Sequence, residues 1–261
     1  MWFRNSEPLF ATESPSYNSP ALSDPTSTAR SNDERPAAAG LIAIDGPVAS
    51  GKTAVGLKLA RELGYRLVDT GVMYRAITYL ALKHGIDVNS DDEALVRLAE
   101  AAGLYLGQPT GDEIASVSAE GEDITGQLRM PEVDRAVSAV SRIPGVRRAM
   151  VERQRALARE GRIIMLGRDI GSVVLPDAPV KIYLDASSGE RARRRYLELK
   201  EAGNERPLAE IREELERRDE MDKNRHASPL RPAADAIVIQ TDNLSLDQVV
   251  DRVREIAGAG R

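Results

Sequence analysis

The residues best suited to chemistry lie at positions 46–53, where the sequence reads Gly-Pro-Val-Ala-Ser-Gly-Lys-Thr. This is the spacing of a phosphate-binding P-loop. Glycines suit such a loop because backbone N–H groups must turn inward around phosphate oxygens, and a Cβ would obstruct that path. The Lys52 ammonium suits the β and γ phosphates, and the Thr53 hydroxyl is a hard oxygen suited to Mg²⁺. We expect the whole loop to bind a nucleoside triphosphate: Gly46, Pro47, Val48, Ala49, Ser50, Gly51, Lys52 and Thr53.

The flanking sequence supplies the elements that such a loop requires. Residues 41–44 form a short apolar run that predicts a buried strand, and the apolar residues Val55, Leu59 and Leu63 follow with helical spacing. A strand before the loop and a helix after it are the context in which this motif binds phosphate. The N-terminus of the helix adds a favourable dipole for an anion.

The rest of the chain predicts an α/β fold. Further strands are expected at 65–69, 162–166, 180–184 and 236–240, with helices between them. This alternation indicates a parallel sheet flanked by helices, with ligands at the carboxyl ends of the strands. Residues 104–128 differ, because glycines surround a short alternating run at 114–119 and a turn at 120–123. They predict a β-hairpin inserted into the main domain.

Composition narrows the class of protein. The chain has 261 residues, a formal net charge of −5 and no cysteine. It therefore has no disulfide or thiolate metal site, and nothing in its charge favours a nucleic-acid partner. We find no apolar run long enough to span a bilayer and no sustained apolar core of a secretory signal, so we expect no membrane partner and a cytoplasmic location.

The N-terminal segment differs in composition from the rest of the chain. Residues 1–38 are rich in Ser, Pro, Thr, Asn and Asp, and their apolar residues are scattered without a period. Such a segment buries too little apolar surface to offset chain entropy, so we predict a disordered tail. The folded domain is then expected at 39–258.

Two polar clusters follow predicted strands. Asp69-Thr70-Gly71 follows the second strand, with Arg75 one turn later, and Gly167-Arg168-Asp169 follows a central strand. Either cluster alone could be an ordinary turn. Because both lie at strand ends on the side of the P-loop, together they favour a substrate site.

A helix after Pro207 gives a further indication. Its apolar residues Leu208, Ile211 and Leu215 lie on one face, and continuing by three and four residues leads to charged side chains. These are Arg218, Asp222 and Arg225. The alternative is a solvated helix end, but a charged continuation of a buried face favours a functional cluster.

Arginine is more abundant at these positions than a simple nucleotide-binding switch requires. The set is Arg75, Arg147, Arg168, Arg191, Arg194, Arg218 and Arg225. Phosphoryl transfer needs positive charge on the phosphate oxygens and little covalent work from the protein, so the set favours a kinase with an anionic acceptor. A GTPase is disfavoured because the Asn-Lys-x-Asp signature is missing, and residues 221–224 have the wrong order.

Five ordered blocks resemble bacterial cytidylate kinases. They are Ile44-Asp-Gly-Pro-x-Ala-Ser-Gly-Lys, Asp69-Thr-Gly-x-Met-Tyr-Arg, Gly167-Arg-Asp-Ile-Gly, Val180-Lys-Ile-Tyr-Leu-Asp-Ala-Ser and Arg218-Asp-x-x-Asp-x-Asn-Arg. The resemblance covers about residues 40–258. It implies transfer of the ATP γ-phosphate to CMP or dCMP with Mg²⁺. It also implies a P-loop kinase core, a nucleoside-monophosphate-binding insert at about 72–150 and a short lid at about 187–206.

The resemblance also implies residue roles. Arg75 and Arg147 would grip the acceptor phosphate, and Arg168, Asp169 and Ser138 would read the cytosine edge. The other substrate-binding residues would be Thr70, Arg218, Asp222 and Arg225, with Asp222 toward the ribose. Catalytic roles would fall to Lys52, Arg168, Arg218 and two lid residues, Arg191 and Arg194. The metal would meet Thr53.

Two alternatives stay open at this point. Another small P-loop kinase could act on a different nucleoside monophosphate or on a small hydroxylated metabolite. An ATP-binding regulatory protein could instead use its tail to recruit a partner. For the kinase we expect a monomer.

Overall fold

The computed structural model describes residues 40–107, 115–225 and 227–259. The predicted tail at 1–38 lies outside these ranges. A five-stranded parallel sheet has the order β2-β6-β1-β7-β8. Its strands are β1 Leu41–Asp45, β2 Arg66–Asp69, β6 Ile163–Gly167, β7 Val180–Asp185 and β8 Ile237–Gln240. The five strands predicted from the sequence are thus confirmed.

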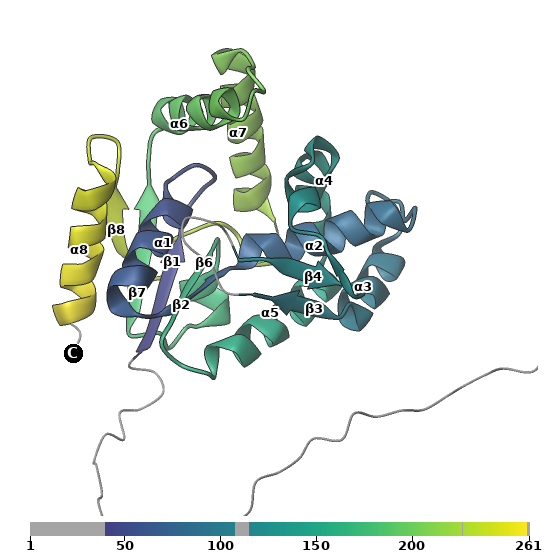
Figure 1. Cartoon of the computed structure of the whole chain (residues 1–261), viewed down its shortest axis with the longest axis horizontal. Helices are drawn as coiled ribbons and strands as arrows, with labels where there is room; N and C mark the ends of the chain where they lie inside the picture. Colours follow the sequence, from purple (N-terminus) through teal and green to yellow (C-terminus); the bar gives the residue numbers. More distant parts are fainter. Residues whose placement is uncertain (1–39, 108–114, 226, 260–261) are drawn as a thin grey trace, which may run out of the picture. The chain divides into compact units, whose positions relative to one another are not determined.

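Helices cover both faces of this sheet (Figure 1). Alternate residues of β1 point to opposite faces, so Ile42 and Ile44 pack with α1 and α8 while Ala43 packs in a second cluster on the other face. The two helices are α1 Lys52–Leu63 and α8 Leu246–Ala259. Continuous apolar strands are what a parallel sheet buried on both faces requires.

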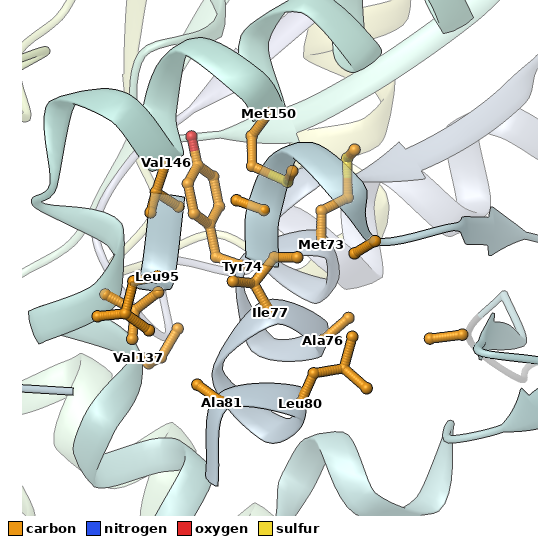
Figure 2. Packing of buried hydrophobic residues seen from close by; sticks show 14 of the residues in the cluster. Met73, Tyr74, Ala76, Ile77, Leu80, Ala81, Leu95, Val137, Val146 and Met150 are labelled. Carbon is orange, nitrogen blue, oxygen red and sulfur yellow. The ribbon is translucent and has the colours of Figure 1, made fainter. Parts of the chain in front are cut away.

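A separate group of helices has its own core. Met73, Ile77 and Leu80 of α2 pack in one cluster with residues of the following helices, as Figure 2 shows. The helices are α2 Thr70–Lys83, α3 Asp92–Ala101, α4 Pro131–Ser141 and α5 Pro144–Ala158. The cluster buries apolar residues of all four helices, while α5 also packs Ala158 with Ile163 and Met165 of the central sheet.

The predicted hairpin at 104–128 is a three-stranded antiparallel sheet. Its strands are β3 Leu104–Leu106, β4 Val117–Ala119 and β5 Glu122–Asp123. Two of the four residues predicted as a turn belong to β5, because the reversal takes place at Glu120 and Gly121, where φ is positive. Residues 108–114 lie outside the described ranges.

The last two helices before β8 run side by side (Figure 1). They are α6 Ser188–Glu201 and α7 Leu208–Asn224. The prediction that the apolar face of α7 is buried was wrong at the N-terminal end of the helix. Leu208 is 48% exposed, because this first residue of the helix projects beyond the cluster that Ile211 and Leu215 form with α6. The buried face continues through Asp219 and Asp222.

Two short turns complete the described structure. They are the 3-10 helix η2 Gly126–Arg129 and the π-helical turn η3 Ile170–Val174, which comes directly after the β6 end and its Arg168-Asp169 pair. Within the described residues, no helix combines the length and the apolarity that crossing a bilayer requires.

Candidate active site

The carboxyl ends of three neighbouring strands bring the candidate residues to one edge of the sheet. The parallel register sets Asp45 of β1 beside Gly167 of β6, and Asp69 of β2 beside Leu166. The P-loop leaves β1 at this edge, and the Gly167-Arg168-Asp169 turn leaves β6 there. The fold therefore brings the two predicted clusters together.

The P-loop has the tight backbone that its glycines predict. Gly46 has φ +148°, and a Cβ there would lie 2.1 Å from the Leu184 carbonyl oxygen. Gly51 has φ +94° and directly precedes α1. Both positions favour glycine, the first for space and the second for its left-handed backbone.

Lys52 is buried inside this loop. Its ammonium group donates hydrogen bonds to the Pro47 carbonyl oxygen at 2.5 Å and to Ser50 Oγ at 3.2 Å. Burial and the nearby Arg168 lower the pKa of Lys52 well below its ordinary value, against the opposing charges of Asp69 and Asp45. The arrangement leaves a cation in a poorly hydrated position, where an anion would stabilise its charged form.

Thr53 lies beside a carboxylate. Its hydroxyl donates to Asp69 Oδ2 at 3.3 Å, while Asp69 Oδ1 accepts from the Gly71 amide and caps α2. These are hard oxygen atoms next to the P-loop. The described residues contain no group of three or more His, Cys, Asp or Glu side chains that could hold a metal.

Asp169 forms a buried ion pair on the other side of the site. Its Oδ2 accepts from Arg147 Nη2 at 2.5 Å, and Arg225 Nη2 lies 3.9 Å from Oδ1. The Arg147 guanidinium also lies over the Tyr74 ring, 5.4 Å from its centroid. Tyr74 packs with Val146 and Met150 in the cluster of Figure 2. The carboxylate is therefore held in one place by a rigid core.

Asp222 contacts Arg225 as well, together with one further arginine, Arg168. Its Oδ2 accepts from Arg168 Nε at 3.2 Å, and its Oδ1 lies 3.7 Å from Arg225 Nη1. Burial and the neighbouring Arg147 lower the pKa of Arg225. Arg225 Nη2 is buried without a hydrogen-bond acceptor in the described structure.

A third carboxylate, Asp134 of α4, lies among arginines of three other helices. Oδ1 contacts Arg75 Nη2 at 2.5 Å and Arg218 Nη1 at 3.5 Å, and Oδ2 contacts Arg195 Nη2 at 3.2 Å. Burial and then the charges of Arg168 and Arg75 lower the pKa of Arg218. The cations repel one another, so the cluster is suited to an additional anion.

Two predicted substrate residues lie at the margin of these clusters. Thr70 is buried, and its hydroxyl donates to the Leu166 carbonyl oxygen at 2.8 Å, which leaves only its acceptor capacity for a ligand. Ser138 is four residues after Asp134 on α4, so both lie on the same face of that helix.

The two arginines predicted for the lid are engaged with protein groups. Arg191 is buried and donates to the Ala186 and Val48 carbonyl oxygens and to Asp219 Oδ2 at 2.5 Å. It therefore ties α6 to the P-loop and to α7. Arg194 donates to both the hydroxyl and the carbonyl oxygen of Thr241, so it joins α6 to the segment after β8.

Sequence reasoning missed several charged residues of the site. Asp45 is buried, and its two oxygens accept from the Ile170 and Gly171 amides, each at 2.8 Å. Burial raises the pKa of Asp45 to about 6, against the lowering effect of those two hydrogen bonds. Asp45 had a usable signal, since it is an acidic residue in an apolar strand. No comparable sequence signal marks Asp134, Arg195 or Asp219, because charged residues on helix surfaces are common.

Comparison with known proteins gives the family. The chain matches the family described as Cytidylate kinase over residues 42–258. The chain belongs to this family. The cytidylate kinase of Desulfitobacterium hafniense (strain Y51) is 46% identical over 212 residues, which cover 81% of this chain and 90% of that protein. The cytidylate kinase of Geobacillus kaustophilus (strain HTA426) is 47% identical over 215 residues, 82% of this chain and 95% of that protein.

Some relatives are much longer than this chain. The bifunctional pantoate ligase/cytidylate kinase of Synechococcus sp. (strain JA-2-3B'a(2-13)) is 47% identical over 230 residues. The match covers 88% of this chain and 42% of that protein, so the chain spans about two fifths of that relative's length. The cytidylate kinase family is thus found both as separate chains and as part of a longer one.

Proposed function

We propose that this protein transfers the γ-phosphate of ATP to CMP or dCMP and gives ADP with CDP or dCDP. Membership of the cytidylate kinase family supports this reaction. The observation that carries it is the arrangement of arginines beside the P-loop. Arg168 lies close enough to Lys52 of the P-loop to lower its pKa, and Arg218 is close to both Arg168 and Arg75, so positive charge extends from the donor loop toward an acceptor as in-line transfer between two anions requires.

Donor binding would use the P-loop from Gly46 to Thr53. The buried Lys52 ammonium would exchange its contacts with Pro47 and Ser50 for phosphate oxygens. Inward amide groups and the N-terminus of α1 would add partial positive charge. The orientation of the β and γ phosphates would follow from the rigid loop rather than from substrate contacts elsewhere.

The residues near the P-loop fit Mg²⁺. Thr53 and Asp69 offer hard oxygens, and Mg²⁺ takes few protein ligands because it keeps water and phosphate oxygens in its coordination sphere. Thr53 would hold the ion. When bound, Mg²⁺ neutralises charge on the phosphates.

Acceptor binding would use the opposite side of the site. Arg75 and Arg147 would bind the CMP phosphate, and Asp222 would meet the sugar. Asp169, Arg168 and Ser138 would read the base, since a carboxylate accepts from the exocyclic amine of cytosine and repels the carbonyl oxygen of uracil. The Arg147 contact and the Asp45-bound turn support this role because they fix Asp169.

The transfer itself would need no covalent intermediate. Arg168 and Arg218 would stabilise charge on the transferred group, with Arg191 and Arg194 of the predicted lid at 187–206 contributing on closure. Closure of the lid and of the predicted insert at 72–150 would exclude water, which would otherwise accept the phosphate. The separate core of α2–α5 supports treating the insert as one body. The cytoplasmic location and the monomeric state stay predictions from the sequence.

ADP production from ATP and Mg²⁺, with CMP, dCMP, UMP, AMP and GMP offered separately, tests the proposal. We expect fast turnover restricted to CMP and dCMP. For Asp169→Ala we expect the preference for CMP over UMP to be lost. An unchanged preference would show that another residue reads the base.

The same assay separates the alternatives. Fast turnover with another nucleoside monophosphate would support kinase activity but reject the residues assigned to CMP binding. Tight ATP binding without turnover on any acceptor would favour the regulatory protein.

A further inference from the structure

One carboxylate of the site is not explained by the roles above. Asp134 projects from α4, and the three arginines around it belong to α2, α6 and α7. These helices are far apart in the sequence, so the contacts are tertiary rather than local. A surface ion pair would involve one arginine and would be screened by water.

The geometry around Asp134 is that of an anion site. Arg75 donates to Oδ1 and Arg195 to Oδ2, while Arg218 approaches Oδ1 from α7. The side chains of Asp134, Arg75 and Arg218 are 17–21% exposed, so the charges are largely desolvated. Guanidinium groups that converge on two oxygens of one carboxylate are also placed for the oxygens of a phosphate.

The charges in this cluster do not balance. Three guanidinium groups face the single carboxylate of Asp134, and Arg195 also pairs with Glu198 at 3.1 Å, which leaves an excess of one positive charge. Burial alone would raise the pKa of Asp134, but Arg75, Arg218 and Arg195 together hold it below its ordinary value. Arg218 Nε is also buried without a hydrogen-bond acceptor in the described structure. The cluster thus has donors and positive charge that Asp134 does not use.

We propose that Asp134 is a positioning residue whose carboxylate gathers Arg75, Arg195 and Arg218 in place of the acceptor phosphate until that phosphate binds. The inference rests on the proposed function, because it takes one of these arginines, Arg75, as a ligand of the acceptor. Arg195 thereby becomes a further residue of the phosphate site, contributed by α6. The phosphate enters against the negative charge of Asp134, so the carboxylate lowers affinity for the acceptor.

Isothermal titration of Asp134→Asn with CMP, cytidine and ATP tests this role. Asparagine keeps the size of the side chain and an acceptor oxygen for the arginines but removes the charge. We expect CMP to bind about tenfold more tightly, which corresponds to about 1.4 kcal/mol. Binding of cytidine, which has no phosphate, and of ATP should change less than about twofold. Asp134→Glu keeps the charge and should stay within about threefold of the original protein for CMP.

The matched control is Glu132→Gln, which removes the same charge from an exposed position of the same helix. It should leave all three affinities unchanged. Unchanged or weaker binding of CMP to Asp134→Asn would overturn the inference, as would an equal gain for Glu132→Gln. A merely structural role would weaken CMP and cytidine together.

The outcome is separable from that of the proposed function. If CMP does not bind the original protein and is not phosphorylated, the proposed function fails and the inference fails with it. If CMP is phosphorylated rapidly but Asp134→Asn does not bind it more tightly, only the inference fails. Circular dichroism spectra of the variants, compared with the original protein, verify that each is folded.

Discussion

The buried ion pair between Arg191 and Asp219 gives the most quantitative prediction about stability. The two side chains are 5% and 8% exposed, and Arg191 Nη2 lies 2.5 Å from Asp219 Oδ2. Replacing Asp219 by alanine would leave the guanidinium in the interior without its hydrogen-bonded carboxylate, with the more distant Glu216 as the remaining counter-charge. Breaking such a pair costs about 3–5 kcal/mol. We expect the lower end, about 3 kcal/mol, because Arg191 keeps the Ala186 and Val48 carbonyl oxygens as acceptors.

Thermal unfolding followed by circular dichroism is the suitable assay. The only tryptophan is Trp2, so neither α6 nor α7 contains a tryptophan whose fluorescence could be followed. For a domain of this size, about 3 kcal/mol corresponds to a fall in Tm of roughly 6–12 °C. Urea unfolding should give the same loss as a lower midpoint with an unchanged slope.

The control is the exposed pair between Arg212 and Glu216 on the same helix, with Nε and Oε1 2.9 Å apart. Arg212→Ala breaks this pair without removing a group that interacts with Arg191, and it should cost less than about 1 kcal/mol because exposed pairs are screened. If Asp219→Ala costs no more than Arg212→Ala, the reasoning from burial is refuted. Combining Arg191→Met with Asp219→Leu should recover most of the lost stability, since it removes both charges.

Two further predictions concern buried groups of the P-loop edge. Lys52→Ala should lower kcat at least about 100-fold with little change in Tm, because it removes charge stabilisation of the transferred group; near-original turnover in the coupled ADP assay would reject the P-loop role. For Asp45, a folded-state pKa raised to about 6 from 3.8 means that the native protein binds more protons than the unfolded chain between these values. The contribution of Asp45 to the free energy of unfolding therefore falls as pH rises through that window. Relative to Asp45→Asn, the free energy of unfolding of the original protein should decrease by about 1 kcal/mol between about pH 5 and about pH 7. Urea unfolding of both proteins at the two pH values measures this, and a pH-independent difference would contradict the assigned pKa.

The sequence predicted those parts of the fold that depend on short-range patterns. Strand 41–44, the P-loop and α1 follow from apolar spacing and glycine positions, which constrain the backbone locally. The Leu208 error arose because helical periodicity alone does not show where a neighbouring helix ends. The turn predicted at 120–123 is longer than the reversal at Glu120 and Gly121, because several residues in this segment favour turns.

The candidate site was predictable only where a motif fixed it. Asp169 and Arg168 were found because they come after a strand at the correct edge. Asp134 could not be found in this way, because an acidic residue in the first turn of a helix is ordinary. Its importance depends on three arginines from other helices, and only the tertiary fold brings them together.

The separate core of α2–α5 has a mechanical consequence. These helices bury apolar residues against one another, but α5 also packs Ala158 with Ile163 and Met165 of the central sheet. Apolar contacts therefore hold α5 on the sheet, whereas the arginine–carboxylate contacts at Asp134 link α4 to α6 and α7. Because salt screens ionic contacts and not apolar ones, ionic strength should affect motion of α4 against α6 and α7 more than the packing of α5 on the sheet.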